Sequence, residues 1–324
     1  MKTSIQIENK LISKPSRLGF KYHIKTFGCQ MNEHDSEKIA GIFNNDGMSK
    51  SDDIDSADIL FVNTCTIREN ADDKLYGTLG HLKKWKDQSS ERRLIVGGCA
   101  AQKDKELVRD RAPWVDVVIG THNTNDVINL LNQSEDWGPI TQIIEESKDI
   151  ESEILPVRES GFSAFVTIQI GCNNSCTFCI VPSVRGIEIS RRPSDIINEI
   201  KNLSNEGIKE ITLLGQNVNS YGRDLMIDNK RSPYFTQLLY KIHEIDGIER
   251  IRFTSPHPKD FKRETLVAVS ELPKIANQIH IPVQSGSDKI LSSMHRGYNQ
   301  KKYLSKIDMI KNIIPDVSLS SDVI

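Results

Sequence analysis

Residues 171–179 read Gly171-Cys172-Asn173-Asn174-Ser175-Cys176-Thr177-Phe178-Cys179. This C-x3-C-x2-C spacing directly follows residues 164–170, an apolar run that predicts a strand. Such tight spacing lets three thiolates converge on one inorganic centre. A [4Fe–4S] cluster normally takes four thiolates, so three local ones would leave one iron open, and open positions are typical of catalytic metal sites.

Two other metal sites could use the same cysteines. Zinc could take the three thiolates together with a distant fourth ligand, although zinc sites favour paired C-x2-C or C-x4-C units. A cluster that only transfers electrons usually has a C-x2-C-x2-C run or the plant-type spacing. The spacing therefore favours a catalytic cluster on Cys172, Cys176 and Cys179, here called the C-terminal triad, with zinc and electron transfer as alternatives.

An open iron points to chemistry that acid–base side chains cannot perform. The amino and carboxylate groups of S-adenosylmethionine (SAM) could chelate that iron, and an electron passed to the sulfonium would then yield a 5′-deoxyadenosyl radical. The cofactor carries such chemistry, while the protein supplies placement and excludes side reactions. Phe178 precedes the last cysteine, where its ring could cover the cluster and the adenine; packing in the core is the alternative.

Strand and helix patterns alternate after the cysteine run. Apolar runs predict strands at residues 164–170, 211–214, 251–253, 279–283 and 317–320. We expect Ser194 to cap the helix after the first strand and Gly207 to end it. Five β/α repeats predict a partial (β/α) barrel. Because Ile324 falls inside a predicted strand, we expect this barrel to be incomplete at the C-terminus.

The first half of the chain predicts a separate open sheet. Phe20, Tyr22 and Ile24 alternate with polar residues, as in a half-buried strand. Continuous apolar runs at residues 59–62, 94–96 and 115–119 suit parallel strands covered on both faces. Helical periods at residues 33–44 and 71–85 separate these strands. The alternation is typical of an α/β domain with an open parallel sheet.

Three dispersed cysteines lie just past predicted strands. Cys29 follows the first strand, Cys65 the second and Cys99 the third. In open α/β sheets, ligands bind at the carboxyl ends of the strands. We therefore expect these three residues, here called the N-terminal triad, to meet at one rim of the sheet.

The domain boundaries follow from a change in composition. Residues 145–153 are polar and acidic and have no apolar period, which is typical of an interdomain linker. We predict an N-terminal domain at residues 20–140, a linker at 141–157 and a second domain at 158–324.

The bulk composition limits the function classes. The 324 residues include 42 Lys and Arg against 44 Asp and Glu, for a net charge of −2, so the strongly basic balance of many nucleic-acid-binding proteins is absent. The sequence shows no apolar secretory leader and no membrane span, which predicts a cytoplasmic protein. In that reducing compartment, six cysteines favour metal ligation or catalysis over disulfides.

The cysteine run resembles the signature of radical SAM enzymes, which place an aromatic residue before the final cysteine. The dispersed stretches resemble the N-terminal domain of the methylthiotransferases; they read Thr26-Phe27-Gly28-Cys29-Gln30-Met31-Asn32-Glu33, Asn63-Thr64-Cys65 and Gly97-Gly98-Cys99-Ala100. Residues 26–32, 215–222 and 280–287 best match the subgroup that modifies N6-isopentenyl-adenosine at tRNA position 37. The resemblance runs from about residue 20 to the end of the chain.

The resemblance implies two [4Fe–4S] clusters. The C-terminal triad would hold the radical-generating cluster, and the N-terminal triad would hold a second cluster whose open iron handles the inserted sulfur. One SAM would supply the radical and another the methyl group, to give 2-methylthio-N6-isopentenyl-adenosine in tRNA. The implied partners are a sulfur donor and a reductant such as flavodoxin or ferredoxin, and we expect a monomer.

The chain departs from the family in two places. After the third clustered cysteine the family continues Val-Pro-Tyr-Thr-Arg-Gly, whereas this chain reads Val181-Pro182-Ser183-Val184-Arg185-Gly186, which bears on substrate choice. The family also continues into more barrel and a small tRNA-binding β-barrel domain, neither of which these residues include. The alternatives are a methylthiotransferase acting on threonylcarbamoyl-adenosine of tRNA or on a ribosomal protein, and an inactive cluster-binding fragment.

Weaker candidates follow two of the barrel strands. Gly215, Gln216 and Asn217 lie past the second strand, where barrel active sites gather, so we expect them to contact SAM; a simple turn is the alternative. Gln284 and Ser285 follow the fourth strand and have the same interpretation.

Arg185, Arg191 and Arg192 form a local basic stretch. Arginine contacts to phosphates position a protein on nucleic acid without reading its sequence. We therefore predict weak RNA contacts at these three residues, with a solvated charged face as the alternative.

Overall fold

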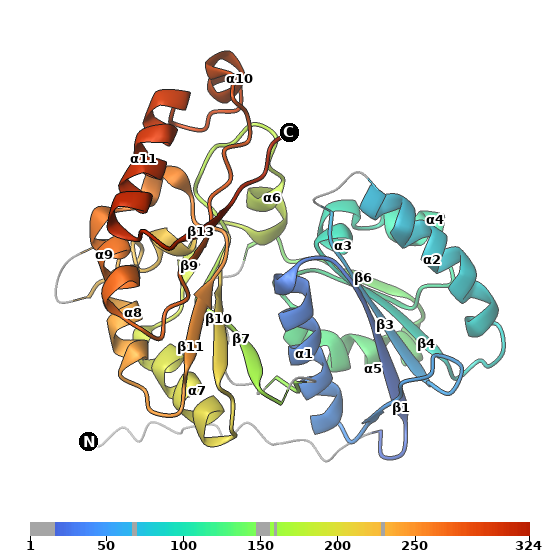
Figure 1. The fold of residues 1–324 in the computed structure, drawn as a ribbon. Helices are drawn as coiled ribbons and strands as arrows, with labels where there is room; N and C mark the ends of the chain where they lie inside the picture. The colour runs from blue at the N-terminus through green and yellow to red at the C-terminus, as the bar shows by residue number, and fades with distance from the viewer. Residues whose placement is uncertain (1–16, 67–69, 147–155, 159–160, 228–230) are drawn as a thin grey trace, which may run out of the picture.

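The structure is a computed structural model that describes residues 17–66, 70–146, 156–158, 161–227 and 231–324. Two α/β halves lie side by side, the N-terminal half in blue to green and the C-terminal half in yellow to red (Figure 1). The predicted fold class, an open parallel-sheet domain followed by an open partial barrel, is confirmed. None of the helices in the described residues could span a membrane.

The N-terminal half is built on a six-stranded parallel sheet with the order β2-β1-β3-β4-β5-β6. Its strands are β1 (Lys21–Phe27), β2 (Ser49–Lys50), β3 (Ile59–Thr64), β4 (Arg93–Gly98), β5 (Val117–Ile119) and β6 (Ile140–Gln142). The four predicted strands are present, whereas the edge strands β2 and β6 are too short and polar to be predicted. Because β6 pairs with β5, it belongs to the sheet rather than to the predicted linker, and residues 147–155 of that linker lie outside the described residues.

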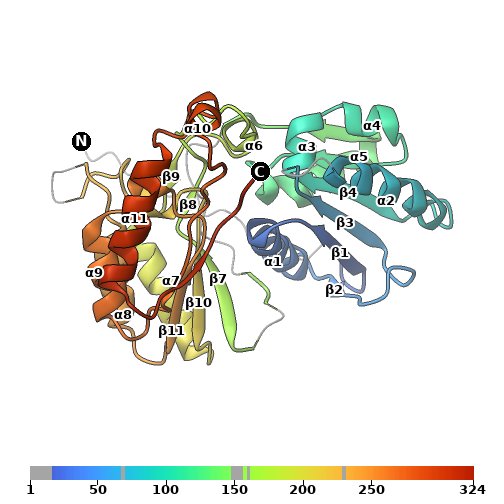
Figure 2. The same cartoon turned by 45° about the horizontal axis from the view of Figure 1, so that its top comes forward.

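Helices cover both faces of this sheet (Figure 2). On one face lie α1 (Gln30–Asn45) and α5 (Val127–Trp137), and on the other α2 (Asn70–Lys86), α3 (Cys99–Asp104) and α4 (Leu107–Arg111). The central strand β3 is buried along its whole length, which explains its continuous apolar run. In β1 the predicted alternation holds only in part, because Tyr22 is buried but Phe20 lies outside the strand and is exposed.

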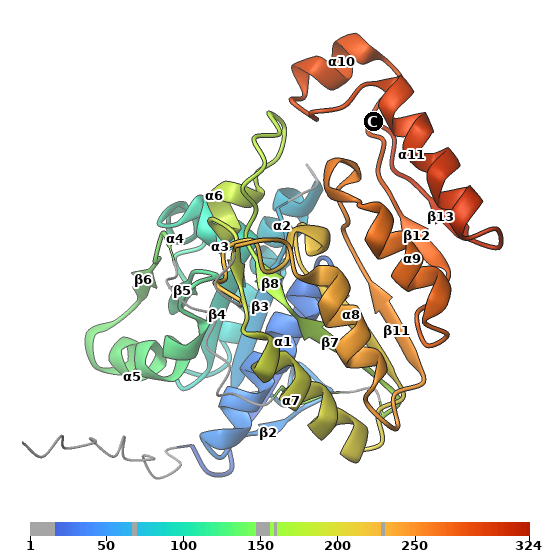
Figure 3. The same ribbon diagram turned by 90° about the vertical axis from the view of Figure 1, so that its left-hand side faces the viewer.

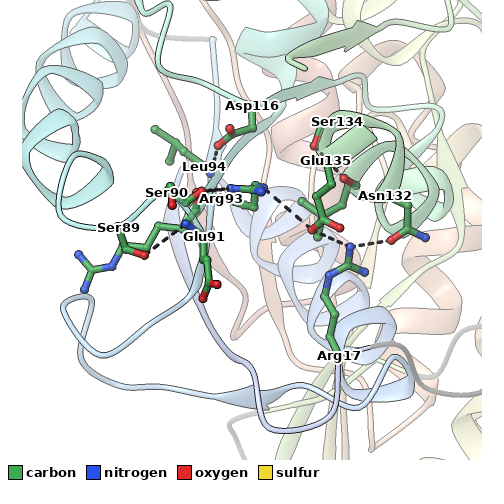
Figure 4. Close-up of polar contacts among 12 residues, drawn as sticks. Arg17, Ser89, Ser90, Glu91, Arg93, Leu94, Asp116, Asn132, Ser134 and Glu135 are labelled. Atoms are coloured by element: carbon green, nitrogen blue, oxygen red, sulfur yellow. Dashed lines mark hydrogen bonds and ion pairs between the residues drawn. The ribbon is translucent and has the colours of Figure 1, made fainter. Parts of the chain in front are cut away.

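A polar network holds the sheet together at the end opposite the cysteines (Figure 4). Arg17 is only 4% exposed, and its guanidinium pairs with Asp46 Oδ2 at 3.1 Å and with Glu135 Oε1 at 3.0 Å. Asp116 accepts a hydrogen bond from the backbone N–H of Leu94, near the start of β4, at 2.7 Å. The network therefore ties the first described residues to the ends of α1 and α5.

The C-terminal half has a three-stranded parallel sheet with the order β11-β10-β7, and a parallel pair of β12 with β13. These strands are β7 (Ser163–Thr167), β10 (Glu210–Leu214), β11 (Arg250–Phe253), β12 (Gln278–His280) and β13 (Ser318–Ser320). An isolated bridge pairs Ile251 of β11 with Ile275, which precedes β12, and the sheets remain open. The strand predicted at residues 164–170 is divided, because β8 (Gln169–Ile170) turns away to pair antiparallel with β9 (Ile189–Ser190).

Five helices follow one another along this half (Figure 3). They are α7 (Pro193–Asn205), α8 (Phe235–His243), α9 (Arg263–Glu271), α10 (Asp288–Ser293) and α11 (Gln300–Ile313). The predicted cap of α7 at Ser194 is wrong. Arg192 holds the N-cap position with extended backbone and no side-chain cap, and Pro193 takes the first helical position, where no N–H is needed.

The two halves meet where the carboxyl rim of the N-terminal sheet faces α6 (Val181–Arg185). Helix α3 packs against α6, and α1 packs against β7, as Figures 1 and 2 show. The Thr121 hydroxyl donates to Val184 O at 2.6 Å, and Val157 N donates to Glu37 O at 2.9 Å. This junction brings together the segments that carry the two cysteine triads.

Candidate functional site

The N-terminal triad lies at one rim of the sheet, as predicted. The last residues of β1, β3 and β4 are paired with one another across the three neighbouring strands. Cys65 directly follows the end of β3, and Cys99 directly follows the end of β4. Cys29 lies two residues after the end of β1. Cys65 N also donates to Phe27 O at 2.8 Å. The pairing order of the strands therefore brings together three cysteines that are far apart in the sequence.

The surroundings of this triad favour a thiolate at Cys29. A hydrogen bond from the Cys65 thiol, followed by the backbone N–H of Asn32 at the start of α1, lowers the pKa of Cys29 to about 6. Cys99 is buried, which raises its pKa, and the guanidinium of Arg185 acts in the opposite direction. A low thiol pKa suits a metal ligand, because the thiolate is the ligating form.

Two asparagines that the sequence reasoning missed support the rim. Asn32 Nδ2 donates to Asn63 Oδ1 at 3.0 Å, and Asn63 Nδ2 donates to Asn32 O at 2.8 Å. Both side chains are buried, and the Cys29 thiol lies 3.4 Å from Asn32 Oδ1. Each asparagine lies within three residues of a triad cysteine in the sequence, which is the signal that could have identified it.

The C-terminal triad lies on the single loop between β8 and α6. Cys172 N donates to Gly186 O at 3.1 Å, which closes the base of the loop. Thr177 N donates to Met294 O at 3.2 Å, so the middle of the loop is held by the segment that follows α10. The loop geometry rests on these few backbone contacts rather than on a sheet.

The thiols of the C-terminal triad are all partly exposed. Burial nevertheless raises the pKa of Cys172 and of Cys179, and each interacts electrostatically with another member of the triad. Arg296 is buried and donates from Nη1 to Cys176 Sγ at 3.4 Å. Both triads therefore have a buried arginine against one of their sulfurs.

A glycine precedes each site at a position where no side chain fits. Gly98 has φ +88°, and a Cβ there would lie 2.2 Å from Asn63 Oδ1 and 2.6 Å from a backbone oxygen. Gly171 has φ +72°, and a Cβ there would lie 1.9 Å from Ile187 O. Both the left-handed backbone and the close approach require glycine.

The donor sets fit iron–sulfur clusters better than a single metal ion. Each triad offers three thiols, which is the set that a [4Fe–4S] cluster with one open iron needs. Among the residues that the structure describes, no three His, Cys, Asp or Glu side chains converge tightly enough to hold one ion. Zinc requires all its ligands at about 2.0–2.3 Å from one point, whereas a cluster takes each thiolate on a different iron.

The residues after β10 include buried acceptors suited to a ligand. Asn217 Nδ2 donates to Asp260 Oδ2 at 2.9 Å, which leaves Asn217 Oδ1 buried and without a partner among the described residues. Gln216 Oε1 is likewise buried and has no hydrogen-bond partner among the described residues. Asp260, which the sequence reasoning missed, also accepts from Arg223 at 2.9 Å. Gly215 begins this segment, and contact of all three predicted residues with SAM remains a prediction.

The remaining candidates lie in less defined surroundings. Phe178 is 46% exposed, so the alternative that it packs in the core is wrong. Gln284 has φ +70°, and its backbone N–H donates to Asp322 O at 3.0 Å. The Ser285 hydroxyl is turned inward and accepts from Ser287 N at 3.2 Å. SAM contacts at these residues also remain predictions.

The arginines predicted to form an RNA-contacting patch do not share a surface. Arg185 and Arg191 are only 5% and 8% exposed. Arg191 pairs with Glu199 Oε2 at 2.6 Å and donates to Thr167 O, and Arg185 faces the N-terminal triad. Of the three, only Arg192 is exposed. The predicted patch is therefore wrong for Arg185 and Arg191, because their guanidinium groups are buried and form ion pairs inside the molecule.

Comparisons with known proteins agree with this division of the chain. Residues 21–120 match a family described as Uncharacterized protein family UPF0004, and residues 166–324 match the Radical SAM superfamily. The C-terminal half of the chain is therefore similar to the radical SAM superfamily.

The curated relatives of this chain have a more specific name. Over 96% of its length the chain is 45% identical to the tRNA-2-methylthio-N(6)-dimethylallyladenosine synthase of Corynebacterium jeikeium. It is 46% identical over 94% of its length to the protein of the same name from Mycobacteroides abscessus. These matches cover 61% and 60% of the relatives, so the chain spans about three fifths of their length.

Solved structures show the same fold at low sequence identity. The radical SAM methyltransferase TsrM from Kitasatospora setae, with tryptophan substrate and a SAM analogue bound, has a TM-score of 0.62 at 11% identity, over 94% of this chain and 67% of that one. The cobalamin-dependent SAM radical enzyme OxsB, with aqua-cobalamin and SAM bound, has a TM-score of 0.61 at 14% identity, over 97% of this chain and 49% of that one. Both likenesses in fold extend over the two halves of this chain.

Proposed function

We propose that this chain carries the two cluster-binding units of a tRNA methylthiotransferase, which converts N6-isopentenyl-adenosine at position 37 of tRNA to its 2-methylthio derivative by radical SAM chemistry. The observation that carries the proposal is the packing of α3, which begins at Cys99, against α6, which follows the loop of the C-terminal triad. The names of the relatives support the choice of tRNA as substrate.

In this proposal the C-terminal triad holds a [4Fe–4S] cluster whose open iron receives SAM. When bound, the pair supplies the one-electron chemistry that the inert C–H bond at C2 of adenine requires. The chain's own residues then bind and orient SAM. The unpartnered acceptors Gln216 Oε1 and Asn217 Oδ1 suit the amino and hydroxyl donors of SAM, while the partly exposed Phe178 lies beside the last cysteine. Gln284 and Ser285 are proposed as further contacts.

The N-terminal triad is proposed to hold the second [4Fe–4S] cluster, which handles the sulfur to be inserted. The low pKa of Cys29 keeps this thiol ionised near neutral pH and therefore ready to ligate iron. The buried Asn32–Asn63 pair fixes the two strand ends against each other, so that the cysteines hold their spacing before a cluster is bound. Both features are those of a site built for a multi-iron group.

The proposed partners follow from the same chemistry. They are a tRNA that carries N6-isopentenyl-adenosine, a sulfur donor, and a reductant such as flavodoxin or ferredoxin for the cluster of the C-terminal triad. We place the reaction in the cytoplasm and the enzyme as a monomer.

Metal content tests the two sites. Iron and acid-labile sulfide are measured per chain after anaerobic reconstitution, for the native sequence and for a variant with all three C-terminal triad cysteines changed to Ala. Two clusters predict roughly 8 irons, falling to roughly 4 in the variant. A matched variant, with the N-terminal triad changed to Ala, should also retain roughly 4 irons. A single zinc, or complete loss of iron in either variant, would overturn the two-cluster proposal.

Mass spectrometry of bulk tRNA tests the substrate. In a strain lacking the gene, 2-methylthio-N6-isopentenyl-adenosine should disappear and its unmethylthiolated precursor should accumulate. Persistence of the product, with loss of the methylthiolated threonylcarbamoyl-adenosine or of a modified ribosomal protein, would assign the enzyme to one of the other substrates. Complementation by this chain alone tests whether it turns over or only binds clusters.

A further inference from the structure

Arg185 reaches from the C-terminal half into the N-terminal triad. It is the last residue of α6, it is 5% exposed, and its Nε donates to Cys99 Sγ at 3.2 Å. Its Nη2 forms an ion pair with Asp35 Oδ2 on α1 at 2.7 Å. Both partners belong to the N-terminal half, so the guanidinium crosses the junction between the halves.

The position of Arg185 is held independently of its charge. Helix α6 packs against α3, which begins at Cys99. The Thr121 hydroxyl donates to Val184 O at 2.6 Å and anchors the residue just before Arg185. Gly186 follows with φ +73°, and a Cβ there would lie 3.3 Å from the His122 ring, so the left-handed backbone after the arginine suits glycine. The guanidinium is therefore aimed at Cys99 by packing on both sides.

A buried guanidinium needs compensating charge, because an unpaired buried charge is costly. Asp35 supplies one negative charge. Arginine is effectively always protonated in proteins, and the Arg185 guanidinium pairs with the Asp35 carboxylate at 2.7 Å. The remaining face of the guanidinium meets the sulfur of Cys99, and a thiolate that ligates iron is the partner that best satisfies it.

We propose that Arg185 is a positioning residue of the N-terminal cluster: it completes that site from the other half of the chain and raises the cluster's reduction potential, while Asp35 lowers it. This inference rests on the proposed second cluster. A cation and a hydrogen-bond donor at a ligating sulfur stabilise the more negative, reduced state of a cluster, and an anion destabilises it. Because α6 follows the loop of the C-terminal triad, the same segment ties the two sites together.

The test measures the N-terminal cluster by itself. The parent protein has Cys172, Cys176 and Cys179 changed to Ala, so that only the N-terminal triad can bind iron. After anaerobic reconstitution, iron per chain is measured and the cluster is titrated potentiometrically, with the reduced form followed by electron paramagnetic resonance. Arg185→Gln should shift the midpoint potential downward, and Asp35→Asn should shift it upward.

Two further variants separate charge from a general loss of structure. The double variant Arg185→Gln with Asp35→Asn removes both charges and should return the potential close to that of the parent. Arg185→Lys keeps the charge but loses the Nε hydrogen bond, so it should give a smaller downward shift and retain iron even if Arg185→Gln loses it. Arg191→Gln is the matched control, because Arg191 is equally buried but pairs with Glu199, and it should leave the potential unchanged.

The outcomes distinguish this inference from the proposed function. If the parent with Arg185 intact binds no iron, the second-cluster proposal fails, and the inference fails with it. If the parent binds roughly 4 irons and the Arg185 and Asp35 variants all titrate at the parent potential, only the role of Arg185 is overturned. Shifts of the same sign for Arg185→Gln and Asp35→Asn would also overturn it, because a structural disturbance has no reason to follow the sign of the charge removed.

Discussion

The two cysteine triads are built in different ways. The C-terminal triad comes from one loop, its thiols are all partly exposed, and a few backbone hydrogen bonds shape it. The N-terminal triad comes from the ends of three strands, two of its cysteines are buried, and its geometry depends on the order in which the strands pair. The first site is local and visible in the sequence, whereas the second exists only when a whole domain is folded. This difference predicts how each site responds to substitution.

The largest effect is expected from the glycine that precedes each site. Gly98→Val should abolish iron binding at the N-terminal triad and spare the other site, because a Cβ at Gly98 would lie 2.2 Å from Asn63 Oδ1. Gly171→Val should do the reverse, because its Cβ would lie 1.9 Å from Ile187 O. Each variant should therefore hold roughly 4 irons instead of roughly 8. Equal loss from both sites in either variant would contradict the independence of the triads.

A distant substitution should reach the N-terminal triad but not the C-terminal one. Arg17→Ala removes the buried guanidinium that pairs with Asp46 and Glu135, which should lower the free energy of unfolding of the N-terminal half by about 3–5 kcal/mol. Denaturant unfolding should show an earlier transition, and iron should be lost from the N-terminal triad first. Exposed Lys83→Ala, which breaks a surface pair with Asp87, is the control and should change stability by less than about 1 kcal/mol.

One asparagine near each triad allows the effect of burial on stability to be compared. Asn63 is buried and bonds to Asn32 in both directions, so Asn63→Ala should cost about 1–3 kcal/mol of stability by leaving buried groups unpaired. Asn173 lies exposed in the other loop, where its side chain accepts from Glu188 N at 3.0 Å. Asn173→Ala should cost less than about 1 kcal/mol, since water can replace the lost contact. Thermal and denaturant melts of the cluster-free protein measure both.

The smallest effect is a difference in thiol reactivity in the cluster-free protein. At pH 7 Cys29, with a pKa of about 6, is mostly thiolate, whereas burial raises the pKa of Cys172 above its ordinary value of 9.0. After allowance for the weaker intrinsic nucleophilicity of a low-pKa thiolate, Cys29 should react with iodoacetamide roughly fourfold faster or more. Its rate should level off above pH 7, while that of Cys172 continues to rise beyond pH 9. Peptide mapping by mass spectrometry measures both rates, and equal rates at pH 7 would contradict the assigned pKa of Cys29.

Local features of the fold could be predicted from the sequence. Continuous apolar runs located β3 and β4 because both strands are buried on both faces. The edge strands β2 and β6 escaped prediction because they are two and three residues long and carry little apolar pattern. The pattern at the start of α7 favours Ser194 as the cap because serine is a common cap, but Pro193 suits the first helical position and places the cap at Arg192.

The charged residues at the junction could not be assigned in this way. Arg185 and Arg191 read as a solvent-facing basic stretch, since most arginines are exposed. Their partners are Asp35 and Cys99 for the first, and Glu199 for the second. Two of these three partners lie in the other half of the chain, and no local pattern indicates such a contact.

The C-terminal triad, the alternation of strands and helices, and the position of each dispersed cysteine just after a strand can all be inferred from sequence patterns. These features depend on spacing within a few residues, where chain geometry leaves little choice. Tertiary structure alone decided that β1, β3 and β4 are neighbours, that their cysteines therefore meet, and that Arg185 from the other half lies against Cys99. Those outcomes depend on pairing and packing between distant segments, whose energies are set by the whole fold rather than by any one stretch of chain.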